Sequence, residues 1–203
     1  YLSQKNFGSS LHWQSQWNQR HQTQLQAYFS WYELDAENQA GNTRKTRQQN
    51  RVFNQGFKLR EGFVLGQKYS LAIGYQLDEI QIKDMSQIDN PTLSSIDRQL
   101  SRTHAVVAES QYKSCDEKTQ LQLGLRGNYF EKIKRFRLEP RLSVSQKITQ
   151  HWTLSLLAEA KSQSLSQVIE LQQDFLSIEK RRWALANGGD IPLQKSRQLS
   201  FGV

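Results

Sequence analysis

Residue types that cross-link or kink a chain are scarce in these 203 residues. The sequence holds one cysteine, Cys115, so no intrachain disulfide can form, and it has only three prolines and one methionine. The four histidines do not have the spacing of a metal-ligand motif: His12, His21, His104 and His151. The sequence therefore predicts no metal site, no cofactor site and no catalytic centre.

Long apolar runs are absent as well. No stretch approaches the roughly 18 apolar residues of a transmembrane helix, and the mean hydropathy is −0.74. Such polarity can indicate disorder, but the leucines and aromatic residues are regularly placed, which argues against a disordered chain. The formal net charge of +8 would suit a surface that binds polyanions, yet the basic residues are dispersed rather than gathered in one run.

Apolar and polar residues alternate most regularly over 135–161. Because strand side chains point to opposite faces with period two, two strands joined by the polar break at 147–150 would each have one apolar and one polar face. The apolar face is expected to carry Phe136, Leu138, Leu142, Val144, Trp152, Leu154 and Leu156. The segment is therefore predicted to be a β-hairpin.

Similar alternation recurs through the chain and predicts about nine strands of roughly ten residues each. The segments without it lie at 35–50, 83–102 and 162–195 and are predicted to be long loops. Within the last of these, apolar residues at helical spacing predict a short helix over 167–175. Short and long connections thus alternate along most of the chain.

Strands of about ten residues can cross a bilayer at a tilt, and short turns at one end with longer loops at the other are typical of outer-membrane β-barrels. Aromatic residues near predicted strand ends would suit the two membrane interfaces: Trp17, Trp31, Tyr69, Tyr129 and Trp152. A soluble β-sandwich, with the apolar face as its core, is an alternative. The pattern favours a membrane barrel whose apolar face meets lipid.

Four short motifs lie in order along residues 136–203. They read LEPRLS at 138–143, QKIT at 146–149 followed by HWTL at 151–154, RRWALAN at 181–187, and IPL at 191–193 followed by KS at 195–196 and QLSFG at 198–202. In this order and approximate spacing they resemble the barrel of TonB-dependent outer-membrane receptors, particularly those of the Bacteroidetes type. The first two thirds of the chain agree with that family only in the pattern of hairpins.

The resemblance implies an all-β fold: an antiparallel, up-and-down transmembrane β-barrel to which residues 1–203 contribute about nine strands of a larger number. The plug domain of such barrels and the segment that contacts TonB would lie outside this chain. The implied partners are outer-membrane lipid, the receptor's own plug, the TonB complex and an imported small ligand, but no nucleic acid. The implied location is the outer membrane of a Gram-negative cell.

The function implied by the resemblance is not enzymatic. It is TonB-dependent, energy-coupled uptake of a scarce ligand of the siderophore, vitamin or oligosaccharide class. Two alternatives stay open: an outer-membrane β-barrel that serves adhesion or anchoring rather than transport, and a soluble, basic β-sheet protein that binds polyanions.

Two groups of residues are candidates for the functional surface. Charged residues on the predicted polar faces would point into the lumen, where they pair with the plug and with one another or line a ligand path: Lys58, Arg60, Arg126, Arg137, Glu139, Arg141, Glu159 and Lys161. In the last long loop, Arg181 and Arg182 beside Trp183 would suit an anionic or aromatic ligand through charge-assisted hydrogen bonds and stacking. In the alternative reading, Trp183 packs this loop onto the mouth of the barrel.

Overall fold

The computed structural model describes residues 1–40, 44–89, 92–170 and 180–203. The regular elements in these ranges are eleven β-strands. Within the described residues, no helix is both long enough and apolar enough to span a bilayer.

Nine of the strands form one antiparallel sheet in which each strand pairs with the next along the chain, except that β8 pairs with β11. These strands are β1 (Leu2–Asn18), β2 (His21–Ala40), β3 (Arg44–Val64), β4 (Tyr69–Asp89), β5 (Thr92–Lys113), β6 (Thr119–Phe130), β7 (Arg135–Lys147), β8 (Thr153–Gln163) and β11 (Gln194–Gly202). The predicted all-β, up-and-down sheet of about nine strands is therefore confirmed.

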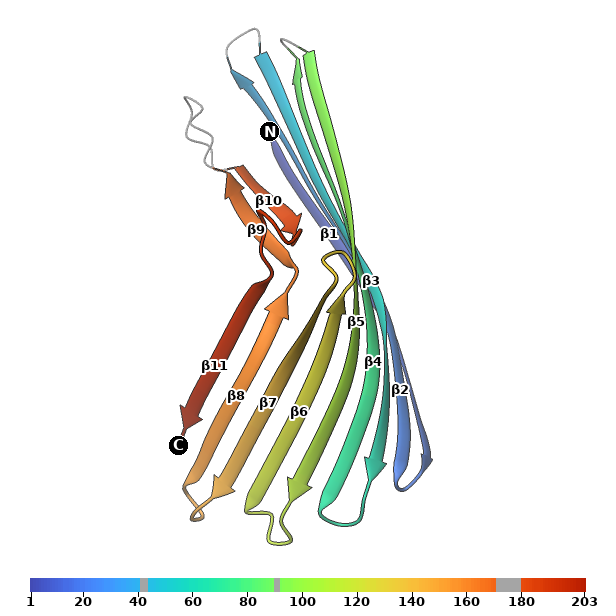
Figure 1. Ribbon diagram of the computed structural model, residues 1–203, viewed down its shortest axis with the longest axis vertical. Helices are drawn as coiled ribbons and strands as arrows, with labels where there is room; N and C mark the ends of the chain where they lie inside the picture. Colours follow the sequence, from blue (N-terminus) through green and yellow to red (C-terminus); the bar gives the residue numbers. More distant parts are fainter. Residues whose placement is uncertain (41–43, 90–91, 171–179) are drawn as a thin grey trace.

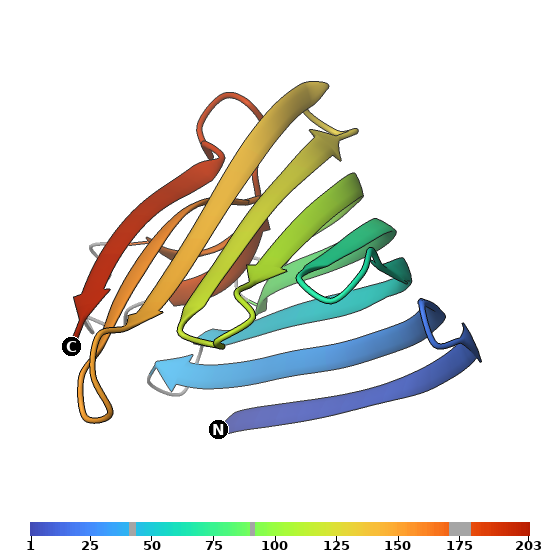
Figure 2. The same cartoon turned by 90° about the horizontal axis from the view of Figure 1, so that it is seen from below.

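The sheet is curved and open, with β1 and β11 at its two edges (Figure 2). The two strands outside it, β9 (Leu165–Glu170) and β10 (Lys180–Leu185), pair with each other as an antiparallel hairpin. This hairpin lies on the concave side of the large sheet and contacts β3, β4 and β5.

Two of the predicted long loops are strands instead. Residues 35–50 belong to β2 and β3, and residues 83–102 belong to β4 and β5, apart from the few residues between these strands. The four strands therefore have 20, 21, 21 and 22 residues rather than about ten. Figure 1 shows β2 to β5 rising well beyond β6, β7 and β8. The prediction was wrong because both faces of these segments carry polar residues, so that no apolar alternation reveals the strand.

The helix predicted over 167–175 is also wrong for the part that is described. Residues 167–170 lie in β9, where Gln167 is opposite Trp183 and Val168 is opposite Arg182. Pairing with β10 supplies the backbone hydrogen bonds that a helix would otherwise have made. Residues 171–175 lie outside the described residues.

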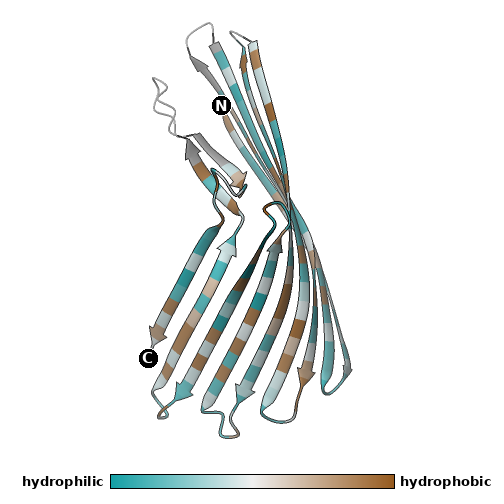
Figure 3. Ribbon diagram, viewed as in Figure 1, coloured by the Kyte–Doolittle hydropathy of each residue, from teal (hydrophilic) through white to brown (hydrophobic). Residues whose placement is uncertain are grey.

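The lower part of the sheet, toward the short turns, has an apolar convex face. Directly opposed residues share a face, and the register places Leu59 opposite Tyr75, Tyr75 opposite Val106, and Leu125 opposite both Ala108 and Pro140. Large exposed apolar side chains on this face include Leu11, Trp13, Leu25, Leu59, Ile73, Val106, Leu123, Leu125, Phe136, Leu138, Leu199 and Phe201. Figure 3 shows hydrophobic positions, in brown, recurring along the lower parts of the strands. An apolar surface that runs across nine strands is far larger than the patches of soluble monomers.

The upper parts of β2 to β5, residues 32–40, 44–52, 79–89 and 92–102, lack this apolar convex surface, and we call them the extension. On their concave face, Val52 and Ile82 are buried against Leu185 of β10. Their convex face carries cross-strand ion pairs instead. Arg51 lies 3.0 Å from Glu33 and Arg102 lies 2.6 Å from Glu79. We call the rest of the nine-stranded sheet the wall.

Candidate functional site: a polar network on the concave wall

The concave face of the wall holds a hydrogen-bonded network that begins at a glycine. Gly56 on β3 lies between Tyr28 and Asp78 in the register. A Cβ atom at Gly56 would lie 2.6 Å from the Tyr28 hydroxyl and 2.3 Å from the Leu77 carbonyl oxygen. The missing side chain therefore lets the Tyr28 phenol cross β3 and donate a hydrogen bond to Asp78. The ammonium of Lys58 lies 5.2 Å from the centre of the Tyr28 ring, within the range of a cation–π interaction.

Gln76 extends the network toward β6. Its Nε2 donates to Asp78 Oδ2 at 2.6 Å, and its Oε1 accepts a hydrogen bond from Nη1 of Arg126 at 2.7 Å. Nε of Arg126 donates to Asn128 Oδ1 at 2.7 Å. The guanidinium is thus fixed by neutral amides on two strands.

Glu139 on β7 is the buried carboxylate of this region, with 4% of its surface exposed. Its Oε2 lies 4.0 Å from Nε of Arg126. Its Oε1 accepts hydrogen bonds from the backbone N–H of Ser162, at 2.7 Å, and from the Ser162 hydroxyl. Because Ser162 lies at the end of β8, just before the β9–β10 hairpin, Glu139 ties the wall to the start of that hairpin.

All eight charged residues predicted for the polar faces lie on the concave face of the sheet. Arg60 pairs with Glu109 at 2.8 Å, and Lys161 pairs with Glu159 at 2.6 Å. Among the described residues, Arg141 has no hydrogen-bond or ion-pair partner, although it is opposite Glu159 in the register. The structure therefore joins most of these residues to partners within the sheet.

A hollow of about 900 Å³ lies beside the network, on the concave face between β4 to β7 and the adjoining ends of β8 and β11. Its charged lining residues are Asp78, Arg126, Glu139, Arg141, Lys161 and Lys195. Lys195 was not predicted to belong to this site because the alternation in β11 is evident only from Leu199 onward. Four cations and two carboxylates give the hollow a positive balance, which suits an anionic group or an acidic protein surface.

The three residues predicted to bind ligand lie in β10. Trp183 packs against the cluster of Val52, Ile82 and Leu185, and its ring meets that of Tyr32 edge-on with 6.5 Å between centroids. The alternative reading, in which Trp183 packs its segment onto the barrel mouth, therefore describes its contacts. The backbones of Arg181 and Arg182 pair with Ile169 and Val168, and the side chains of both arginines lie outside what the structure describes.

Comparison with known proteins identifies the fold. No protein-family model matches the sequence, and no curated protein matches it. Three solved structures match with 10–17% identity: the ferric citrate transporter FecA in its unliganded form (TM-score 0.61, 79% of this chain, 17% identical), the RagAB peptide transporter (0.63, 99%, 10%), and the siderophore receptor PirA from Acinetobacter baumannii (0.50, 99%, 16%).

The chain spans only part of the length of these proteins. It covers 28% of the FecA chain, 28% of the RagAB chain and 40% of the PirA chain. Their titles describe two transporters and a siderophore receptor, and likeness at this identity concerns the fold. This chain has the fold of a section of the β-barrel of TonB-dependent outer-membrane receptors.

Proposed function

We propose that residues 1–203 form part of the barrel of an outer-membrane receptor that imports a scarce ligand with energy passed through TonB. The observation that carries this proposal is the pairing of an apolar convex face with a charged concave face over nine up-and-down strands. Apolar side chains on the outer face of such a sheet are stable in contact with lipid, whereas the interior of a barrel accommodates charged residues that have partners.

The two edges of the sheet support placement in a larger barrel. In the described residues, β1 and β11 each have one neighbouring strand. Backbone N–H and C=O groups without partners are costly in hydrocarbon, so an open edge is not viable there. We infer that further strands of the same protein pair with β1 and β11, and that a plug domain of that protein contacts the concave face.

The positive hollow supports a role for the concave face in holding the plug or in passing an anionic ligand. Arg126 and Glu139 are fixed by the network, whereas Arg141 and Lys195 have no partner among the described residues. The neighbouring transporters include proteins titled for ferric citrate and for peptides. For this chain we propose a ligand of the siderophore, vitamin or oligosaccharide class.

We further propose that Arg181 and Arg182 contact the ligand, while Trp183 holds the hairpin in position. The test is to replace both arginines with alanine in the complete receptor and to measure ligand affinity. We expect weaker binding with unchanged surface amounts, and the exposed Lys45→Ala variant in the extension is the matched control. Wild-type affinity of the double variant would contradict this assignment.

The function itself can be tested by deleting the gene and following depletion of a ligand panel from the medium. The panel would contain ferric citrate, a ferric hydroxamate siderophore, cobalamin and a mixture of oligosaccharides. We expect one class to be consumed only when both this gene and TonB are present. An outer-membrane protein without TonB-dependent uptake would favour an adhesion or anchoring barrel. A product that is soluble without detergent would exclude both barrel functions and favour polyanion binding.

A further inference from the structure

A row of basic residues crosses the convex face where the wall meets the extension. Register pairs Lys5 with Glu33, Glu33 with Arg51, Arg51 with Lys83, and Lys83 with Arg98. We call the four cations Lys5, Arg51, Lys83 and Arg98 the basic row. Neighbouring strands are about 4.8 Å apart, so the row extends roughly 20 Å across β1 to β5. It contains four cations and one carboxylate.

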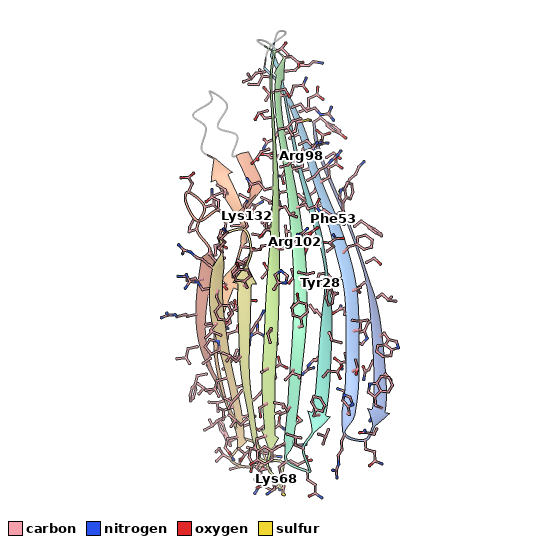
Figure 4. All side chains as sticks on the ribbon, turned by 45° about the vertical axis from the view of Figure 1, so that its right-hand side comes forward. Tyr28, Phe53, Lys68, Arg98, Arg102 and Lys132 are labelled. Carbon is pink, nitrogen blue, oxygen red and sulfur yellow. The ribbon has the colours of Figure 1, made fainter. Side chains whose placement is uncertain are left out.

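An apolar row lies directly below the basic row, on the side of the short turns. It consists of the residues two positions further along each strand toward the wall, which are Phe7, Trp31, Phe53 and Leu100, with the polar Gln81 on β4 as the exception. Figure 4 shows Phe53 on this face with Arg98 further toward the tip of the extension. On β1 to β3 the basic row therefore begins where the apolar side chains end, whereas on β4 and β5 Gln81 and the ion pair of Glu79 with Arg102 lie between it and the apolar wall. The edge of the apolar surface is the depth at which lipid phosphate groups lie if the wall spans the bilayer.

Acidic residues on this face do not neutralise the basic row. Glu33 Oε1 lies 3.0 Å from Nη2 of Arg51 and also accepts a hydrogen bond from Gln49 at 2.7 Å. Lys83 and Arg98 have no hydrogen bond or ion pair within the part of the chain that the structure describes.

The nearest acids on either side already have cationic partners. Asp35, on the tip side, is held by Arg47 at 2.7 Å and 3.2 Å, and Lys5 acts on it only at longer range. Glu79, on the wall side, is held by Arg102 at 2.6 Å. Unpaired positive charge is thus concentrated at the boundary itself.

We propose that the basic row binds the phosphate groups of a phosphorylated glycolipid of the outer leaflet, lipopolysaccharide, whose acyl chains lie against the apolar row. The inference rests on the proposed function, because tight turns on the periplasmic side place the extension outside the cell. Glu33 orients the guanidinium of Arg51, while the ammonium of Lys83 and the guanidinium of Arg98 supply donors without partners in the protein. Arginine and lysine both bind phosphate through charge-assisted hydrogen bonds.

The test uses the complete receptor, purified in detergent, and measures the binding of lipopolysaccharide and of enzymatically dephosphorylated lipopolysaccharide. The variant carries Lys5→Gln, Lys83→Gln and Arg98→Gln, and keeps Arg51 because it pairs with Glu33. The matched control carries Arg20→Gln, Lys68→Gln and Lys147→Gln, which remove three exposed cations at the short-turn end. Figure 4 shows Lys68 at that opposite end. Heat-modifiable mobility would first establish that each variant is folded.

We expect the triple variant to bind lipopolysaccharide on the order of 100-fold more weakly, since each cation near an anionic lipid surface contributes about 1 kcal/mol, or about fivefold. The affinity of the short-turn control for lipopolysaccharide should stay within about twofold of the wild-type affinity. The wild-type receptor should bind dephosphorylated lipopolysaccharide as weakly as the triple variant binds intact lipopolysaccharide. Equal binding by wild type and the triple variant, or equal loss in the control, would overturn the inference. The inference would also be overturned if the wild-type receptor bound phosphatidylglycerol vesicles as tightly as lipopolysaccharide and lost that binding in the triple variant.

The outcome is separable from that of the proposed function. A receptor that fractionates with the outer membrane and imports its ligand, but shows no phosphate-dependent binding at the basic row, would refute only the lipid site. A protein that fractionates as soluble would refute the membrane placement.

Discussion

The wall and the extension share four strands and a continuous backbone ladder, yet beside the β9–β10 hairpin the polarity of their faces is reversed. In the wall, Leu59 and Tyr75 lie on the convex face and Lys58 lies on the concave face. In the extension, Arg51 and Lys83 lie on the convex face, whereas Val52 and Ile82 are buried on the concave one. Strand geometry requires only that successive side chains point to opposite faces. Which face is apolar therefore depends on whether that face contacts lipid, water or other protein. The reversal therefore marks the level at which β2 to β5 leave the bilayer in the proposed orientation.

The largest effect is expected from the concave face of the extension. Leu185 is fully buried against Val52 and Ile82, so Leu185→Ala should destabilise the hairpin locally by about 2–5 kcal/mol through lost burial and a cavity. Faster amide hydrogen exchange in β9 and β10 would report this. Leu100→Ala is the control because Leu100 is on the convex face and 43% exposed. Unchanged exchange in the Leu185 variant would show that the cluster does not hold the hairpin.

The next largest effect is expected when an arginine is introduced on the convex face of the wall rather than on the convex face of the extension. Leu125→Arg places a charge within the apolar surface and should cost about 2–4 kcal/mol if that position lies near the bilayer midplane. Ile96→Arg adds the same charge at a position beyond the basic row and should be tolerated. Heat-modifiable mobility and yield in the outer membrane measure both. Equal behaviour of the two variants would argue against a membrane boundary between them.

A smaller effect is expected from the glycine on the concave wall. Gly56→Ala forces its new methyl group against the Tyr28 hydroxyl and the Leu77 carbonyl oxygen, so overpacking should lower the stability by about 1–3 kcal/mol. Gly8→Ala is the matched control, because a Cβ there would meet its nearest atom at an ordinary 3.7 Å. Denaturant midpoints in detergent would compare the two. If Gly56→Ala were as stable as Gly8→Ala, the route of Tyr28 across β3 would not depend on the glycine.

The smallest effect concerns pH at the tip of the extension. A hydrogen bond from Arg47 lowers the pKa of Asp35 below its usual value of 3.8. A carboxylate with a lowered folded-state pKa stabilises the fold at neutral pH, and this contribution is lost as the pH falls through the folded-state pKa. Hydrogen exchange in β2 and β3 should therefore differ between wild type and Asp35→Asn at pH 7, and the difference should shrink below a pH of about 4. A difference that grows on acidification would contradict the assigned partner.

The strands of the wall could be predicted from the sequence because their alternation has a large amplitude. Leu121, Leu123 and Leu125 alternate with glutamine, glycine and arginine. Such a period of two is typical of a β-strand with one apolar and one polar face. The same alternation placed the eight charged residues on one face. The network they form with Tyr28 and Gln76 could not be foreseen, since it depends on the register of several strands and on Gly56.

The extension could not be predicted because its composition resembles that of a loop. Glu33 and Asp35 are matched by Arg51 and Arg47, but these pairs are recognisable only once β2 and β3 are in register. Similarly, Arg102 lies 23 positions after Glu79 in the sequence. For residues 167–170 the helical spacing was misleading for a related reason, because a short hairpin strand that packs through a few apolar residues has no period long enough to be distinctive.

One measurement tests the reversal of polarity most directly. In a Cys115→Ser background, single cysteines would replace the convex residues of β4 in turn: Leu71, Ile73, Tyr75, Leu77, Glu79, Gln81, Lys83 and Met85. The complete receptor in its native outer membrane would then be exposed to a membrane-impermeant maleimide. We predict protection from position 71 to position 77 and labelling from position 81 to position 85, with the change near Glu79. Uniform labelling along β4, or protection that continues to Met85, would contradict the account.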